Sequence, residues 1–255
     1  KYAHVPMILG EDGKKLSKRQ GAASVIEYRD MGLLPEAVLN YLVRLGWSHG
    51  DQEIFTLDEM VEHFDIEDVN KAASALNHQK LLWLNQHYLK TSAVEHVARH
   101  LSWHMGQQGL DPSTGPALER VVEAQRERAK TLVEMAQNSA FFYCDVEGYD
   151  EKAARKNLTP DAVPVLLQMI DALGDLADWS AEAIHGVVEA LAERLELKLG
   201  KVAQPLRVAC SGGSVSPPLD VTLELLGRER VLERLQRAVD FIREETGVDD
   251  PREAH

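Results

Sequence analysis

Cysteine, aromatic residues and long apolar runs are all scarce in this sequence. Its two cysteines, Cys144 and Cys210, lie far apart and outside any Cys-x-x-Cys pair, so they predict neither a disulfide framework nor a thiolate zinc site. No apolar run approaches the roughly 18 residues that a membrane-spanning helix needs. These absences favour a cytoplasmic protein over a secreted or membrane-embedded one.

The remaining composition predicts a helical protein. Aromatic residues make up only 6% of the 255 residues, β-branched residues are sparse outside short runs, and Leu, Ala, Glu and Arg dominate. The length exceeds one typical domain, so we expect two or more. The chain opens KYAHVP, without an initiator Met, and we expect it to be part of a longer polypeptide.

The charges are unevenly distributed. The whole chain carries a formal net charge of -13, which argues against indiscriminate binding to nucleic acid. Residues 1–19 nevertheless carry five cations against two anions, and residues 200–243 carry seven against five. Local basic surface therefore exists at both ends, where it can meet phosphate.

The stretch GKKLSKRQG, residues 13–21, packs four cations into six residues between two glycines. Flexible ammonium groups on such a loop suit a reaction in which negative charge develops on a departing phosphate group. The stretch is neither a Walker A loop nor a dinucleotide-binding G-x-G-x-x-G pattern. Taken alone, the cluster favours a solvated charge run over a phosphate-binding loop.

The surrounding sequence supplies the context. Residues Lys15-Leu16-Ser17-Lys18-Arg19 resemble the KMSKS signature of class I aminoacyl-tRNA synthetases. Residues 4–55, with their LPEA helix start and LGWSHGD turn, resemble bacterial glutamyl-tRNA synthetases almost continuously. A second block, residues 201–235, is similar to the end of the anticodon-binding region of that family.

This resemblance implies a function. In the family, glutamate and ATP (with Mg²⁺) form glutamyl-adenylate, and the acyl group then passes to tRNA(Glu). The resemblance implies that Lys18 binds the ATP phosphates, that Lys15 and Arg19 support it, and that Ser17 holds the loop. The nucleotide-binding fold of the family, with its His-Ile-Gly-His signature and glutamate pocket, is expected to precede this segment. The segment alone is therefore expected to be inactive, and the family resemblance implies a monomer.

The resemblance also implies RNA binding by the rest of the chain. Sequence-specific readout of RNA favours unstacked loop bases whose edges meet polar groups. The candidates are Lys201, Arg207 and the loop around Ser216, with Arg126 and Arg128 as weaker ones. Arg207 is expected in an irregular loop that also contains Pro205, where pairing along a helix face does not explain it.

The expected fold is all-α: a helical stem-contact domain, then a helical-bundle anticodon-binding domain, after a short non-helical remnant of the catalytic domain. The remnant of the catalytic domain is expected at residues 1–22 and the stem-contact domain at residues 23–90. The anticodon-binding region is expected at residues 91–255, with subdomains 91–199 and 200–255. Ser24, Pro35 and the pair Thr56 and Glu59 are expected at helix starts. Residues 117–138 are expected to form one long helix.

Several features have competing interpretations. Arg228, Arg230, Arg234 and Arg237 fit either ion pairing with nearby glutamates or contact with RNA. His96, His100 and His104 share a helix face, but three turns spread them too far for one metal ion, and no metal site is expected. Trp83, Trp103 and Trp179 are expected in the core, and both cysteines are expected to be buried.

Two alternative functions remain open from the sequence. One is a stand-alone helical module for RNA or protein binding, derived from such a synthetase, in which the basic loop is vestigial. The other is a paralogue that attaches glutamate to tRNA(Gln). The intact Lys15 to Arg19 signature favours the enzyme over the module.

Overall fold

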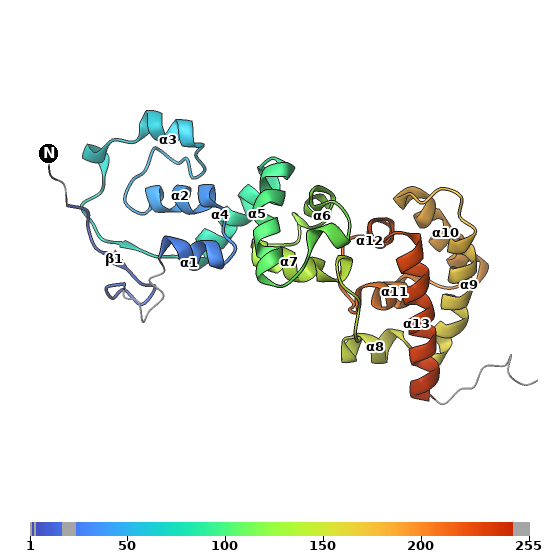
Figure 1. Cartoon of the computed structure of the whole chain (residues 1–255). Helices are drawn as coiled ribbons and strands as arrows, with labels where there is room; N and C mark the ends of the chain where they lie inside the picture. Colours follow the sequence, from blue (N-terminus) through green and yellow to red (C-terminus); the bar gives the residue numbers. More distant parts are fainter. Residues whose placement is uncertain (1, 3, 17–23, 247–255) are drawn as a thin grey trace, which may run out of the picture. The chain divides into compact units, whose positions relative to one another are not determined.

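A computed structural model describes residues 2, 4–16 and 24–246 of the chain (Figure 1). This part is predominantly helical, with one small sheet, which confirms the predicted all-α class. The described residues form two compact units, one drawn from residues 1–109 and 125–137, the other from 110–124 and 138–255. No described helix combines the length and apolar character needed to cross a bilayer. The predicted boundaries at residues 22, 90 and 199 separate parts by their expected roles, in catalysis, stem contact and anticodon binding, and they stay predictions.

The first unit carries the sheet and the amino-terminal helices. Its elements are β1 (Ile8–Leu9), α1 (Val25–Asp30), α2 (Pro35–Arg44), α3 (Leu57–His63), a 3₁₀ turn (Ile66–Asp68), β2 (Ser74–Ala75), α4 (His78–Thr91) and α5 (Val94–Gln107). Helices α6 (Leu118–Gln125) and α7 (Leu132–Ser139) each contribute residues to both units. The predicted starts of α1, α2 and α3 are confirmed: Ser24 with Glu27 and Thr56 with Glu59 form capping boxes, and Pro35 occupies the first turn of α2.

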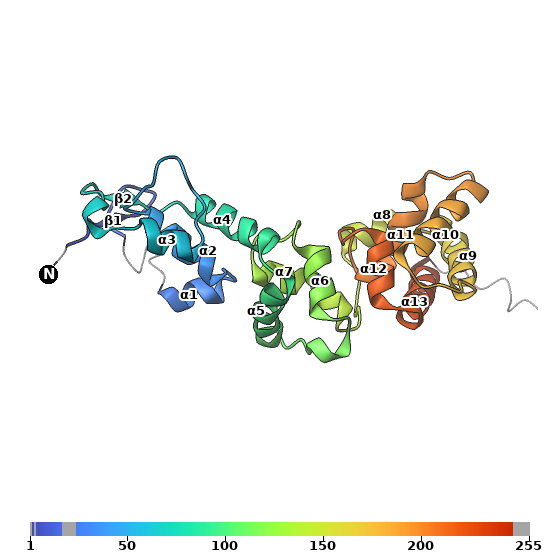
Figure 2. The same cartoon turned by 90° about the horizontal axis from the view of Figure 1, so that it is seen from above.

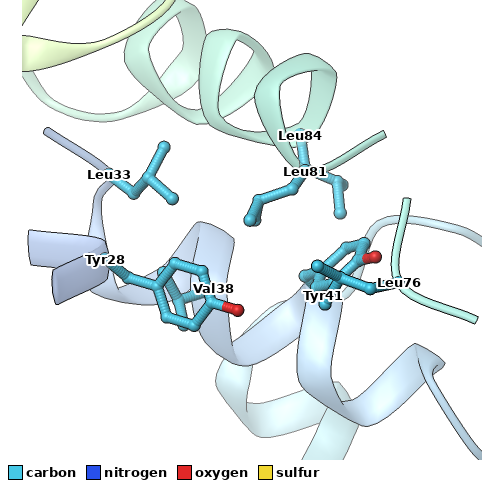
Figure 3. Close-up of a cluster of buried hydrophobic side chains, with 7 residues drawn as sticks. All are labelled: Tyr28, Leu33, Val38, Tyr41, Leu76, Leu81 and Leu84. Carbon is cyan, nitrogen blue, oxygen red and sulfur yellow. The ribbon is translucent and has the colours of Figure 1, made fainter. Parts of the chain in front are cut away.

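The core of the first unit lies where α1 and α2 meet α4. Figure 3 shows its apolar side chains pointing toward one another from these helices, from the connection between α1 and α2 and from the residue after β2: Tyr28, Leu33, Val38, Tyr41, Leu76, Leu81 and Leu84. The parallel pair β1 and β2 lies beside this cluster, in the register Ile8 with Ser74 and Leu9 with Ala75. Leu16 packs against the same cluster, so the first residues of the signature are anchored to it.

A buried asparagine joins three segments of this unit. Asn85 of α4 is fully buried, and its Oδ1 accepts from the Leu34 amide at 2.8 Å. Its Nδ2 donates to the Lys130 carbonyl at 2.6 Å and, at 3.4 Å, to that of Gly32. One buried side chain thereby contacts three main-chain groups of separate segments.

The expectation of a single helix over residues 117–138 is wrong, because the chain turns between α6 and α7. The Lys130 carbonyl accepts from Asn85, and the Leu132 amide donates to the Gly32 carbonyl at 2.8 Å, so neither group serves a helical ladder. Thr131 starts α7 instead, since its Oγ1 accepts from the Glu134 amide at 3.1 Å. The Thr-x-x-Glu spacing at residues 131–134 was the sequence signal for this start.

The second unit is a helical bundle. Its elements are 3₁₀ turns at Pro112–Thr114, Ala140–Phe142 and Pro160–Ala162, and the helices α8 (Glu151–Asn157), α9 (Val163–Gly174), α10 (Ala181–Arg194), α11 (Leu199–Ser211), α12 (Leu219–Leu226) and α13 (Arg228–Thr246). Helix α13 packs along α9 and α11, and α10 packs against α11 and α12 (Figure 2).

Pro205 lies inside α11, so the expectation that it belongs to a loop is wrong. A proline within a helix removes one i to i−4 hydrogen bond and is normally disfavoured. Here Pro205 is buried among the apolar residues that α11 contributes to the bundle, and this packing offsets the lost hydrogen bond. The helix ends at Gly212, whose φ of 78° is left-handed, and the irregular segment is shorter than the sequence indicated.

Candidate nucleotide and nucleic-acid sites

The described part of the signature loop begins as a tight hairpin. The Gly10 amide donates to the Lys14 carbonyl at 2.8 Å, and the Leu16 amide donates to the Ile8 carbonyl at 3.0 Å. Leu9 and Lys15 therefore face each other as an antiparallel bridge. Lys15 is exposed, as is Lys14, and no ion pair within the described ranges involves either ammonium. Both cations are accessible to an anionic ligand. Ser17, Lys18 and Arg19 lie outside the described residues.

A cavity of about 600 Å³ in the second unit is lined in part by Lys201. Two further exposed lysines line it, Lys156 from the end of α8 and Lys198 from the residue before α11, against one acidic residue, Asp161. No side chain caps the amino terminus of α11, where the helix dipole favours negative charge. The cavity therefore suits a phosphate-bearing ligand. The sequence did not single out Lys156 or Lys198, because only the fold brings them beside Lys201.

Arg207 and Ser216 lie together, but their contacts belong to the fold. Arg207 is part of α11, and its Nη1 donates to the Ser216 carbonyl at 3.2 Å, to the Ser216 hydroxyl and to the Pro217 carbonyl at 2.7 Å. Ser216 is buried and contacts Thr222 at 3.1 Å through its hydroxyl. Arg207 thus holds the segment after Gly212 against α11, and the loop position predicted for it is wrong.

The two weaker candidates belong to the first unit. Arg126 donates from Nε to the Leu89 carbonyl at 3.1 Å and from an Nη to the Ser92 carbonyl at 2.7 Å. It thereby places a cation at the carboxyl terminus of α4, where the dipole favours it. Arg128 is exposed. Lys201, Arg207 and Ser216 come from the second unit.

The four arginines of α13 donate hydrogen bonds to main-chain carbonyls. Neither ion pairing with glutamates nor contact with RNA, the two interpretations from the sequence, anticipated this. All four donate to carbonyl oxygens of other segments, and Arg228 also lies over the Trp179 ring. Arg234 is almost completely buried, and burial lowers the pKa of its guanidinium. The acceptors are the carbonyls of Leu176 for Arg228, Phe142 and Thr114 for Arg230, Cys210 and Cys144 for Arg234, and Val146 for Arg237. These four arginines fix α13 to the main chain of the segments around it.

Two other expectations about side-chain burial are wrong. Trp83 and Trp103 keep 47% and 37% of their surface exposed, and Arg29 lies over the Trp103 ring at 4.3 Å. Cys144 is also exposed, whereas Cys210 is buried as expected. The Leu and Ala neighbours of the tryptophans in the sequence do not distinguish a core position from the partly covered edge of a helix face.

The three histidines of α5 differ in their contacts and burial. His96 Nε2 lies 2.6 Å from Glu36 Oε1 on α2. Burial lowers the pKa of His100 and lowers that of His104 to about 4. Among residues 2, 4–16 and 24–246, no group of three or more potential metal ligands occurs.

His104 should make the stability of the first unit depend on pH. Its pKa is about 4 in the folded protein and about 6.5 in an unfolded chain. The folded state therefore binds fewer protons, and stability is fully present above pH 6.5 and is lost as the pH falls toward 4. We expect protonation linked to His104 to lower the free energy of unfolding by about 2 kcal/mol between pH 7 and 4.5. Urea unfolding of the wild type and of His104→Gln at both pH values measures it, with the exposed His4→Gln as control. An equal loss in wild type and His104→Gln contradicts the assignment.

The sequence matches two known families. Residues 92–239 match the anticodon binding domain, and residues 1–83 match the catalytic domain of class I tRNA synthetases (E and Q). The two ranges together cover most of the chain.

Individual relatives agree with these matches. The chain is 65% identical over 241 residues to a glutamate–tRNA ligase 1 of Alkalilimnicola ehrlichii, covering 94% of this chain and 51% of the relative. It is 57% identical over 247 residues to a glutamate–tRNA ligase 2 of Halorhodospira halophila, covering 97% and 52%. The chain thus spans about half the length of these relatives.

A solved structure agrees as well. The crystal structure of a glutamate tRNA ligase from Elizabethkingia meningosepticum, in complex with its amino acid, superposes with a TM-score of 0.82 at 30% identity. The match covers 94% of this chain and 51% of that one. The resemblance to glutamyl-tRNA synthetases is confirmed. The chain belongs to the anticodon-binding domain family and is homologous, at its amino-terminal end, to the class I tRNA synthetase (E and Q) catalytic domain.

Proposed function

We propose that this chain is the part of a glutamate–tRNA ligase that supplies the ATP-phosphate loop and the grip on tRNA(Glu). The observation that carries the proposal is identity of 57–65% to glutamate–tRNA ligases over nearly the whole chain. The separate binding module is not favoured, because those relatives are ligases and the signature cations are retained. We further propose a cytoplasmic monomer.

The loop acts on the phosphates of ATP. Lys18 binds them and stabilises charge that develops on the departing pyrophosphate, with Lys15 and Arg19 beside it and Ser17 holding the loop. The exposed ammonium of Lys15, which takes part in no ion pair among the described residues, supports this role, since such a cation interacts strongly with a triphosphate. Mg²⁺ accompanies ATP and neutralises part of its charge.

The helical remainder binds tRNA. The cavity with Lys156, Lys198 and Lys201 supports contact with the phosphate backbone, because it combines three cations with the positive end of α11. Arg207 and Ser216 hold the segment after Gly212 against α11, so their part in binding is to keep that segment in place. Arg128 remains a candidate for backbone contact, and Arg126 acts through the end of α4.

Removing the charge of Lys201 should weaken RNA binding. Lys201→Ala is expected to lower the affinity of this chain for tRNA(Glu) about three- to tenfold and to reduce the salt slope by about one contact. Filter binding or fluorescence anisotropy between about 50 and 200 mM salt measures both quantities. Lys71→Ala removes an exposed lysine of the first unit as a matched control. If both variants bind alike, the cavity is not a backbone site.

The ligase activity is tested with a chimera. The part of the Alkalilimnicola ehrlichii ligase that precedes the matched region is joined to this chain, and charging with glutamate is measured on tRNA(Glu) and tRNA(Gln). The proposal predicts glutamyl-tRNA(Glu) and none from this chain alone. Charging of both tRNA species identifies the paralogue without discrimination. A folded chimera that charges neither overturns the proposal.

A further inference from the structure

The turn that precedes the signature is attached to a distant helix through one acidic side chain. Glu11 lies at the tip of the hairpin formed by Ile8 to Leu16, and its Oε1 accepts from the His78 amide at 3.2 Å. His78 is the first residue of α4 and lies 67 positions further along the chain. The contact therefore joins the loop to the helix whose side chains form the core of the first unit.

This contact is favourable at that end of α4. The first amides of a helix have no partner within it, and the helix dipole attracts a negative charge there. The Asn77 side chain already accepts from the Lys80 amide at 2.9 Å, and Glu11 satisfies the His78 amide beside it. Two residues of separate segments thus cap one helix.

The hairpin is held from its other side as well. The Leu9 carbonyl accepts from the Leu76 amide at 2.8 Å, so the strand opposite Lys15 is fixed to the residue after β2. Between this anchor and Glu11 the turn has little freedom. The direction in which the chain leaves at Lys15 and Leu16 is set by both attachments.

The same contact affects the charge of the loop. A glutamate in a turn with Lys14 and Lys15 is a ready partner for their ammonium groups, and pairing would weaken their attraction for phosphate. Within the described ranges no ion pair joins Glu11 to either lysine, and its carboxylate lies against the His78 amide instead. The arrangement keeps the acid away from the cations that the loop presents.

We propose that Glu11 is a positioning residue for the signature loop: by capping α4 it fixes the exit direction of Lys15 and keeps its own carboxylate from neutralising the loop. This rests on the proposed function for its effect on ATP. The attachment itself does not depend on it, so the two can be tested separately.

The first arm uses this chain alone and needs no ligase activity. Amide hydrogen exchange of Gly10, Leu16 and His78 is compared in wild type, Glu11→Ala and Glu11→Gln. Alanine is expected to speed exchange at these amides about five- to tenfold at an unchanged unfolding midpoint, and glutamine, which keeps an acceptor, about twofold or less. Unchanged exchange in Glu11→Ala overturns the attachment.

The second arm uses the chimera and ATP–pyrophosphate exchange. Glu11→Ala is expected to lower kcat/KM for ATP about five- to tenfold with less than a twofold change in KM for glutamate, and Glu11→Gln should restore most of it. Glu62→Ala, which removes an exposed glutamate of α3, is the matched control. Equal kinetics of Glu11→Ala and Glu62→Ala would overturn the positioning role of Glu11. If the unmutated chimera shows no ATP–pyrophosphate exchange, the proposed function is overturned. In that case the hydrogen-exchange experiment alone decides whether Glu11 attaches the turn to α4.

Discussion

Alanine at position 18 is expected to lower the rate of ATP–pyrophosphate exchange by the chimera about a hundredfold. A charged donor aimed at developing negative charge contributes on this scale, and removing one such group costs a factor of 100 or more. The expected hundredfold loss of rate follows from the role proposed for Lys18, which is to stabilise the charge that develops on pyrophosphate. Exchange should fall mainly through kcat, because the interaction strengthens as pyrophosphate departs.

The control separates catalysis from recognition. Binding of tRNA(Glu) to the Lys18→Ala chimera should stay within about twofold of the unmutated value, since the loop contacts ATP rather than RNA in this account. Lys71→Ala, which removes an exposed lysine elsewhere in the first unit, should leave exchange unchanged. Undiminished exchange in Lys18→Ala removes this residue from the mechanism.

Asn85→Ala is expected to destabilise the first unit by about 2 to 4 kcal/mol. The substitution leaves the buried Leu34 amide and the part-buried Lys130 carbonyl without the partner that Asn85 supplies, and it also removes the longer contact to Gly32. Each buried group without a hydrogen bond costs about 1 to 3 kcal/mol. Urea unfolding followed by circular dichroism measures the loss.

Asn70→Ala serves as the control for this substitution. The Asn70 side chain is exposed, so its removal should change stability by less than about 0.5 kcal/mol. Asn85→Asp should also be strongly destabilising, because a carboxylate accepts but does not donate, and the Lys130 carbonyl needs a donor. A loss below about 1 kcal/mol in Asn85→Ala contradicts the linking role assigned to this residue.

Sequence patterns predicted the helices best where a start is defined by a few neighbouring residues. Ser24 and the pair Thr56 and Glu59 were recognised because the cap residue and the amides it accepts from lie within four residues, although the reciprocal contact of Glu27 was not predicted. The break between α6 and α7 was missed, since it depends on Asn85 and Gly32, which are distant in sequence. Pro205 was assigned to a loop because helix propensity takes no account of the packing that retains it.

Site residues, too, could be predicted only where they are neighbours in the sequence. The signature at residues 15–19 could be recognised from sequence because its cations are adjacent. The cavity around Lys201 could not, since Lys156, Lys198 and Lys201 meet only when α8 and α11 pack together. The arginines of α13 show the converse. Their spacing fitted either ion pairing with glutamates or contact with RNA, but their partners are main-chain carbonyls of distant segments that no local pattern reveals.

Anticodon-dependent binding tests the central claim most directly. The affinity of this 255-residue chain is measured for a tRNA(Glu) transcript and for the same transcript with its anticodon replaced, at one fixed salt concentration. Replacing the anticodon is expected to weaken binding at least tenfold, because the helical bundle is proposed to read the unstacked bases of the anticodon loop. Equal affinity for the two transcripts would contradict it.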